Sequence, residues 1–264
     1  MKIIDVRYLI VVVGLAIAGC VHMEDSGDSA LIMTSQAQEA SLGAQAFTQI
    51  KSEGKVSNDP AVNAQVRGVA ERLIKVVNMP ADTQWEVVVF DDPTPNAFAL
   101  PGGKIGVNTG ILALTQNDAG LAAVIGHELA HVKFRHGGQR MTRQMLSEYG
   151  MTAVGGLLNM NEVQNSDMIM SALGVGAQYG AILPYSRGDE SEADKYGLIY
   201  MARAGFDPRE SLAFWQRMKE YSEKAGSKTP EFLSTHPADE TRIKQIKAWL
   251  PEAEAIYRQT QGAH

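Results

Sequence analysis

Apolar residues recur at helical spacing in several stretches of the chain. The clearest begins at Asp59-Pro60, a good helix start, and its apolar side is formed by Val62, Val66, Val69, Leu73 and Val76. The same spacing predicts helices over residues 36–47 and 240–250. Another helix is predicted to start at residues 206–208, with core positions Leu212, Phe214, Trp215 and Met218.

A different pattern, typical of strands, occupies the middle of the N-terminal half. Residues 85–90 read Trp-Glu-Val-Val-Val-Phe, and residues 91–95 read as a turn. Two more strands, 97–100 and 104–108, are predicted on either side of Pro101-Gly102-Gly103. These patterns predict an α+β fold that is mainly helical and carries one small β-sheet.

The most apolar predicted helix follows this sheet and contains two histidines. Asn117 and Asp118 offer side-chain oxygens for its N-cap, and Gly137-Gly138 is predicted to loosen or end it. His127 and His131 are four residues apart, so both imidazoles lie on one face and can reach a single metal ion.

Glu128 lies between these histidines and can accept a proton from water. The result is the H-E-x-x-H pattern of zinc hydrolases. Two imidazoles and one further protein ligand would leave a fourth position of zinc open for water. His136 is five positions past His131, on a different helical face. We therefore predict that His136 is a surface or capping histidine, with a ligand role as the alternative.

A candidate third ligand comes from an acidic stretch further along. Glu190 and Asp194 are four apart and would share one helical face. Glu190 could complete a His-His-Glu site, and Asp194 could accept the outward N–H of a metal-bound histidine. Alternatively the stretch is a solvated helix face, which is our prediction for Asp189 and Glu192.

His127-Glu128-Leu129-Ala130-His131 followed by Ser186-Arg187-x-x-Glu190-x-x-Ala193-Asp194 resembles the gluzincin zinc metallopeptidases of the HtpX and CAAX-prenyl-endopeptidase family. The nearest likeness is to periplasmic and outer-membrane lipoproteins of the BepA and LoiP kind, without a tetratricopeptide domain. Residues 96–105 and Ser234-Thr235-His236-Pro237 with Arg242-Ile243 resemble two further motifs. The resemblance covers roughly residues 58–250.

The resemblance implies a zincin-like domain with one zinc ion per chain. It assigns His127, His131 and Glu190 as zinc ligands and Glu128 as the general base. It also places His236, which as a loop residue could simply be exposed, at the cleft. There His236 could donate to the oxyanion or occupy the open zinc position, and Arg242 could orient it.

The resemblance also implies an edge strand beside the cleft. Such a strand can bind an extended polypeptide through backbone hydrogen bonds, which favours unfolded proteins as substrates. An ordinary hairpin that closes the sheet is equally compatible with the residues. The candidate substrate-binding residues are Asn96, Ala97, Phe98 and Ala99.

The N-terminus has the pattern of a targeting segment. Residues 1–19 carry Lys2 and Arg7 before an apolar run, which predicts a signal peptide. Ile17-Ala18-Gly19-Cys20 resembles a bacterial lipobox, in which Cys20 would be lipidated. A retained membrane anchor is an alternative, although the apolar run is short for a span. Cys20 is the only cysteine, which excludes an intramolecular disulfide.

The predicted organisation is therefore a signal peptide (1–19), a lipidated cysteine with a flexible tether (20–36) and one domain (37–264). Val21 after the cysteine favours the periplasmic face of the outer membrane. Loss of residues 1–19 removes Lys2, Arg7 and Asp5 and so changes the net charge from −6 to −7. This acidity and the lack of a basic stripe argue against nucleic acid as a partner.

One uncharged segment, residues 168–183, is too short to span a membrane and is predicted to pack under the site. Alternatively residues 145–185 form in part a mobile lid. Together the motifs predict a zinc endopeptidase of the bacterial envelope that hydrolyses unfolded or misassembled envelope proteins. Two alternatives stay open: a zinc-stabilised chaperone or binding lipoprotein, and a zinc hydrolase of small amides. The sequence leaves the oligomeric state open.

Overall fold

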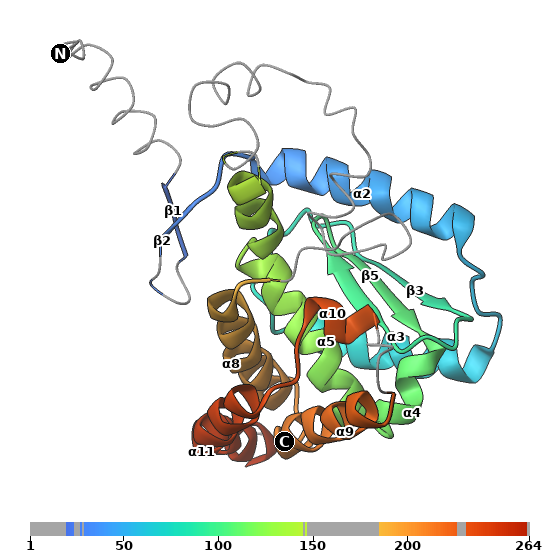
Figure 1. Cartoon of the computed structure of the whole chain (residues 1–264), viewed down its shortest axis with the longest axis vertical. Coiled ribbons are helices and arrows are strands. Elements are labelled where there is room, and N and C mark those ends of the chain that lie inside the picture. Colours follow the sequence, from blue (N-terminus) through green and yellow to red (C-terminus); the bar gives the residue numbers. More distant parts are fainter. Residues whose placement is uncertain are drawn as a thin grey trace, which may run out of the picture.

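The computed structural model describes residues 20–23, 27, 29–144, 146, 185–225 and 231–262 (Figure 1). The predicted signal peptide and the segment 168–183 lie outside these residues, as does nearly all of the predicted lid. Among the described helices, none is both long and apolar enough to cross a membrane.

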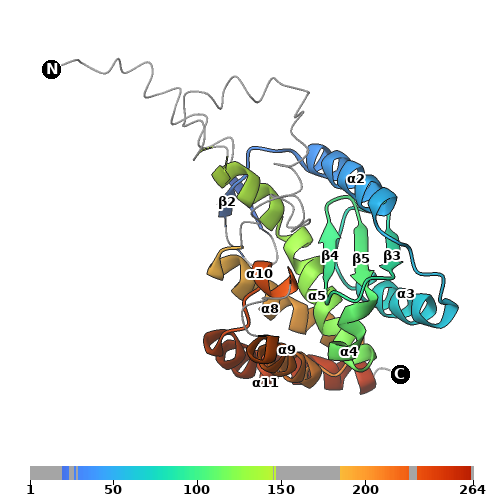
Figure 2. The ribbon, with the colours of Figure 1, turned by 45° about the vertical axis from the view of Figure 1, so that its right-hand side comes forward.

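The N-terminal half of the domain contains a three-stranded sheet. Its strands β3 (Glu86–Phe90), β5 (Lys104–Asn108) and β4 (Ala97–Leu100) lie in that order, with β4 at one edge (Figure 2). β3 and β5 are parallel, and β4 and β5 are antiparallel. All three strands lie within a residue of their predicted positions.

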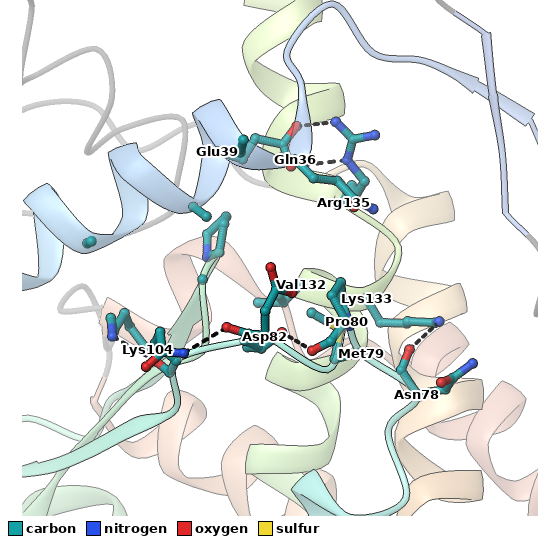
Figure 3. Close-up of a pocket in the computed structure, with 17 residues that line it drawn as sticks. Gln36, Glu39, Asn78, Met79, Pro80, Asp82, Lys104, Val132, Lys133 and Arg135 are labelled. Atoms are coloured by element: carbon teal, nitrogen blue, oxygen red, sulfur yellow. Dashed lines mark hydrogen bonds and ion pairs between the residues drawn. The ribbon is translucent and has the colours of Figure 1, made fainter.

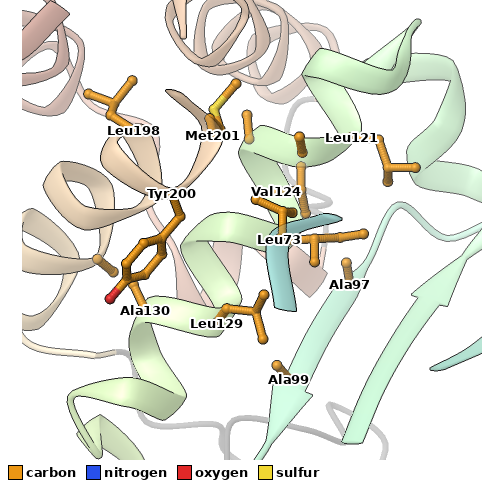
Figure 4. Close-up of a cluster of buried hydrophobic side chains, with 14 of the residues drawn as sticks. Leu73, Ala97, Ala99, Leu121, Val124, Leu129, Ala130, Leu198, Tyr200 and Met201 are labelled. Carbon is orange, nitrogen blue, oxygen red and sulfur yellow. The ribbon is translucent and has the colours of Figure 1, made fainter. Parts of the chain in front are cut away.

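Helices cover both faces of this sheet. α2 (Gln36–Glu53) covers one face, where Phe98 and Leu100 pack with Phe47. α3 (Pro60–Ile74) and α5 (Asp118–Lys133) cover the other, where the side chains of Ala97 and Ala99 point towards α5 (Figure 4). Side chains alternate between the faces of a strand, so β4 contributes to both cores. The short η1 (Thr109–Ile111) and α4 (Leu112–Thr115) lead into α5.

The helix α5 ends earlier than predicted. It begins at Asn117, whose side chain accepts from the Gly120 N–H, but it stops at Lys133, and Arg135 has a left-handed φ of 55°. Residues 136–144 are helical again, so Gly137-Gly138 lies inside this second stretch. The prediction that the two glycines end the helix was therefore wrong.

Arg135 is held in this unusual conformation by a buried ion pair. Its guanidinium lies 2.8 Å from Oε1 and 3.1 Å from Oε2 of Glu39, and it also donates to the Thr34 carbonyl. A left-handed φ costs about 1–3 kcal/mol in a residue with a Cβ, so such contacts are needed to maintain it. The pair lies at a pocket of about 470 Å³ between α2, the 78–84 loop and the end of α5 (Figure 3).

The C-terminal half is a set of helices packed on the other side of α5. α8 (Arg187–Arg203) lies against α5, and α9 (Arg209–Ala225) and α11 (Glu240–Gly262) complete the layer. Phe214, Trp215 and Met218 are buried as predicted. The predicted helix 240–250 continues to Gly262 through Pro251, and the predicted loop 229–237 contains the short helix α10 (Glu231–Thr235).

Part of residues 20–36, predicted as a lipidated cysteine and a flexible tether, forms regular secondary structure. β1 (Cys20–His22) and β2 (Ser29–Leu31) form an antiparallel hairpin. Met23 and Ile32 are buried in the core, and the Met33 N–H donates to Thr142. This segment is therefore attached to the domain shortly after Cys20.

Candidate metal centre

Four side chains from three parts of the chain converge on one point. His127 and His131 come from α5, Glu190 from the first turn of α8, and His236 from the residue after α10. One ligand atom from each lies within 4.8 Å of all the others, and all four residues are buried.

The individual distances show how closely these atoms approach. His131 Nε2 lies 3.0 Å from His127 Nε2 and 3.3 Å from Glu190 Oε1. His236 Nδ1 lies 3.2 Å from His127 Nε2 and 2.8 Å from Glu190 Oε1. Several lone-pair atoms thus face one another, an arrangement that a cation stabilises. Imidazole nitrogens and a carboxylate in a compact group are a donor set that zinc accepts.

The protonation states also suit metal binding. Burial lowers the pKa of His131 to about 3 and that of His127 well below its ordinary value, so both imidazoles are neutral. Burial alone would raise the pKa of Glu190, but His236 and Arg242 hold it well below the ordinary value. Neutral imidazoles and an ionised carboxylate are the forms that bind a metal ion.

Asp194 contacts His127 on the side away from the donor group, and Arg242 lies 3.2 Å from both ring nitrogens of His127. Asp194 Oδ1 lies 3.0 Å from His127 Nδ1, at the position predicted from its spacing to Glu190. Arg242 lies 2.6 Å from Asp194 and 2.8 Å from Glu190, so it bridges the two carboxylates. Its guanidinium stacks on Trp215 at 3.3 Å from the ring centroid. The sequence predicted Trp215 as a core residue but gave no sign of its contact with Arg242.

Glu128 lies between the donor group and the sheet. Its Oε1 is 3.3 Å from His236 Nε2, and the backbone of Ala99 on β4 lies near its carboxylate. Burial raises the pKa of Glu128 to about 7, and a cation beside it would lower that value. A carboxyl with a pKa near neutrality is suited to accept and return a proton.

The edge strand β4 presents only part of its backbone to the site. The Asn108 N–H donates to the Asn96 carbonyl at 2.9 Å, so this pair is of the hydrogen-bonded type. Hydrogen-bonded and non-hydrogen-bonded pairs alternate along an antiparallel ladder. Ala97 and Ala99 therefore belong to the non-hydrogen-bonded type, and their backbone N–H and C=O groups point away from β5. Of the four candidate substrate-binding residues, only these two therefore offer free backbone groups. Phe98 packs under α2, and the Asn96 carbonyl is used by β5.

Three predictions about the surroundings were wrong. His136 is fully buried, and its Nδ1 lies 2.9 Å from His131 Nδ1, because the left-handed turn at Arg135 brings it back towards α5. Glu192 is not a solvated acid, since its Oε2 lies 2.9 Å from His136 Nε2. Asp189 is also buried, where it completes the capping box of α8 with Ser186 and pairs with Arg143 at 2.7 Å.

Sequence reasoning also missed an aromatic contact. The ring of Tyr185 stacks on His131 with centroids 4.0 Å apart, and the guanidinium carbon of Arg140 lies over the Tyr185 ring, 3.9 Å from its centroid. Tyr185 directly precedes the Ser186 cap of α8, and that position next to a candidate ligand segment was the one signal available.

Comparison with known proteins assigns the chain to a family. The model of peptidase family M48 matches residues 60–250. The chain belongs to peptidase family M48. M48 membership confirms the predicted metallopeptidase and, with the four grouped side chains, the zinc cofactor. The observed mainly helical architecture confirms the α+β zincin-like fold. Membership of family M48 does not by itself show the narrower likeness to the HtpX and CAAX-prenyl endopeptidases.

Relatives of this M48 chain come from mitochondria and from bacteria. It is 38% identical to the mitochondrial metalloendopeptidase OMA1 of Schizosaccharomyces pombe over 75% of this chain and 56% of the relative. It is 31% identical to the β-barrel assembly-enhancing protease of Yersinia pestis over 85% of this chain and 46% of the relative. The Escherichia coli protein of the same name is 29% identical over 85% of this chain and 46% of the relative. The chain thus spans about half the length of these relatives.

Proposed function

We propose that this M48 chain is a zinc metalloendopeptidase of the bacterial envelope that hydrolyses unfolded or misassembled polypeptides. The observation that carries the proposal is the position of Glu128. It lies beside the four grouped donor side chains and near the backbone of Ala99 on the free edge of β4. A proton acceptor, a metal-binding group and a peptide-binding edge therefore meet at one place.

In this proposal His127, His131 and Glu190 hold the zinc ion. Bound zinc polarises a carbonyl group and lowers the pKa of water to about 7. Glu128 takes a proton from the attacking water and returns it to the nitrogen of the leaving amine. Asp194 accepts from the outward nitrogen of His127 and fixes its tautomer, and Arg242 holds Asp194 and Glu190 in place.

His236 has two candidate roles in this scheme. Its Nδ1 belongs to the donor group, and its Nε2 faces Glu128 at 3.3 Å. It could therefore occupy a metal position in a resting state, or, after a small movement, donate to the oxyanion of the tetrahedral intermediate. The resting role also favours the second candidate function, a zinc-stabilised chaperone or binding lipoprotein with little proteolysis.

Unfolded polypeptide is the substrate class that the free edge supports. Ala97 and Ala99 can pair with an extended segment through backbone groups, which carry no information on side chains. A folded protein rarely exposes such a segment. The name of the Yersinia pestis relative, β-barrel assembly-enhancing protease, links that protein to the assembly of other proteins and supports this proposal.

The proposed location depends on the N-terminal sequence. Ile17-Ala18-Gly19-Cys20 supports lipidation of Cys20 and attachment to the periplasmic face of the outer membrane. The wild type should incorporate labelled palmitate and fractionate with outer membrane, whereas Cys20→Ser should not be labelled. Unlabelled wild type in the soluble periplasm would contradict this location.

Turnover of casein, an unfolded protein, tests the activity. Cleavage that stops on addition of a chelator and returns with zinc would support the endopeptidase. Binding of casein without cleavage in the zinc-loaded protein would favour the chaperone. Cleavage only of small amides, with casein intact, would favour a hydrolase of another substrate class.

A further inference from the structure

The two histidines of α5 are both contacted on the nitrogen that points away from the donor group. For His127 the contact is a carboxylate, Asp194. For His131 it is another imidazole, since His131 Nδ1 lies 2.9 Å from His136 Nδ1. The other nitrogen of His136, Nε2, lies 2.9 Å from Glu192 Oε2. His131, His136 and Glu192 thus form one continuous hydrogen-bonded row.

This row depends on the break in the helix at Arg135. In an uninterrupted helix His136 would face away from His131, because five residues correspond to about 500° of rotation. The left-handed φ of Arg135 reverses the chain locally and brings the two rings to a centroid distance of 4.8 Å. His136 is fully buried and stacks on Phe134, so its ring has little freedom to turn.

Metal binding leaves only one arrangement of protons along the row. If His131 binds through Nε2, its hydrogen is on Nδ1, and His136 must accept with an unprotonated Nδ1. The hydrogen of His136 is then on Nε2, where the Glu192 carboxylate accepts it. A doubly protonated His136 would place two N–H groups against each other at 2.9 Å.

We propose that His136 and Glu192 are positioning residues that orient His131 and strengthen its bond to zinc, through hydrogen bonds from His131 to His136 and from His136 to Glu192. The inference rests on the proposed assignment of His131 as a ligand. Hydrogen-bonded groups polarise one another along a row, so the carboxylate acts on His131 although an imidazole separates them. Partners of this kind typically change metal affinity by about 10- to 100-fold.

Zinc affinity of the whole chain, measured by competition with a chelator, tests the proposal. His136→Leu should bind zinc about 10- to 100-fold more weakly, since it removes both hydrogen bonds. His136→Gln should restore most of the affinity. The oxygen and nitrogen of an amide are separated by one carbon, as the two ring nitrogens are, so Gln can accept from His131 and donate to Glu192. The exposed His22 gives the matched control, His22→Leu, with unchanged affinity.

Glu192 provides an independent variant, because its side chain is 18% exposed and its replacement leaves the ring of His136 in place. Glu192→Leu should weaken zinc binding in the same direction as His136→Leu. The double variant should be no weaker than His136→Leu alone, because Glu192 acts only through His136. Thermal unfolding of the metal-free proteins, monitored by circular dichroism, separates weaker zinc binding from loss of fold.

Two results would overturn the proposal. One is unchanged zinc affinity in both Leu variants. The other is additive loss in the double variant together with failure of His136→Gln to restore affinity, which would make His136 a packing residue. If His136→Leu does not fold, Glu192→Leu alone decides. These measurements need no turnover. A wild type that binds zinc but leaves casein intact would therefore contradict the proposed endopeptidase function without contradicting the positioning role of His136 and Glu192.

Discussion

Gly126 of α5 and Gly197 of α8 lie back to back where the two helices cross. A Cβ built on Gly126 would stand 3.2 Å from the Gly197 carbonyl oxygen, and one on Gly197 would stand 3.1 Å from the His127 backbone nitrogen. Such contacts are tighter than ordinary van der Waals distances. The close approach lets Glu190 and Asp194, on α8, reach His127 and His131, on α5.

The first prediction follows from this crossing. Gly197→Ala should push α5 and α8 apart, lower the free energy of unfolding by about 1–3 kcal/mol and weaken zinc binding. The control is Gly188→Ala in the first turn of the same helix, where the nearest atom is Ser186 Oγ at 3.7 Å. That variant should gain about 0.5–1 kcal/mol, because Ala favours a helix more than Gly does. Denaturant unfolding and zinc titration measure both effects, and equal behaviour of the two variants would contradict the prediction.

A second prediction concerns zinc content. The wild type should hold about one zinc ion per chain, and Glu190→Ala should lose most of it, since a carboxylate ligand is removed. Metal analysis after dialysis measures this. Glu252, exposed on α11, gives the control Glu252→Ala, which should keep its zinc. Full zinc content in Glu190→Ala would remove Glu190 from the ligands.

The third prediction separates catalysis from metal binding. Glu128→Gln keeps the shape of the side chain and should keep zinc and fold. Casein cleavage should fall by several orders of magnitude, because an amide cannot accept the proton of water. Zinc analysis and initial rates on one preparation check both parts. A rate near that of the wild type would show that another group is the base.

The fourth prediction distinguishes the two roles of His236. Its Nδ1 already belongs to the donor group, so His236→Ala should weaken zinc binding without slowing casein cleavage, and cleavage could rise. Chelator competition and casein rates measure the two effects. A rate about 100-fold lower with unchanged zinc affinity would give His236 the oxyanion role instead. Unchanged rate and affinity would remove it from the site.

The fifth prediction concerns pH and a site far from the metal centre. Glu86 lies 2.5 Å from Lys51 and 3.6 Å from Lys104, and its pKa is lowered by the hydrogen bond from Lys51. A carboxyl group with a lowered pKa in the folded state stabilises the fold at pH values above its unfolded pKa of about 4.3. This contribution is lost as the pH falls through the folded-state pKa. Glu86→Gln should therefore cost about 0.2–1 kcal/mol at pH 7 and almost nothing near pH 2. A cost that is independent of pH would contradict this origin.

The sequence was sufficient where the signal is local. The spacing of His127 and His131 depends only on helical geometry, and the cap at Asn117 is a neighbouring residue, so both were predictable. The strands were predictable because short apolar runs are bounded closely by the turn at residues 91–95 and by Pro101-Gly102-Gly103. That His236 lies near Glu190 was implied by the family resemblance and not by the residues around it.

What failed depends on contacts between distant residues. His136 was predicted to face away because an unbroken helix was assumed, and the break is held by Glu39 of another helix. Glu192 and Asp189 were predicted to be solvated because acidic residues usually are, but each lies beside a cation or imidazole from the segment after α5. No local pattern reports such partners.

The order in which the site residues occur along the chain has a consequence for synthesis. His127, Glu128 and His131 all belong to α5. Glu190, His236 and Arg242 follow much later, on α8, directly after α10 and on α11. A nascent chain emerges from the ribosome N-terminus first, so two histidines and the base are present long before the carboxylate that completes the ligand set. On the proposed assignment, a growing chain therefore cannot cleave itself or its neighbours. Hydrolytic competence arises only when the C-terminal helices have been made and have packed onto α5.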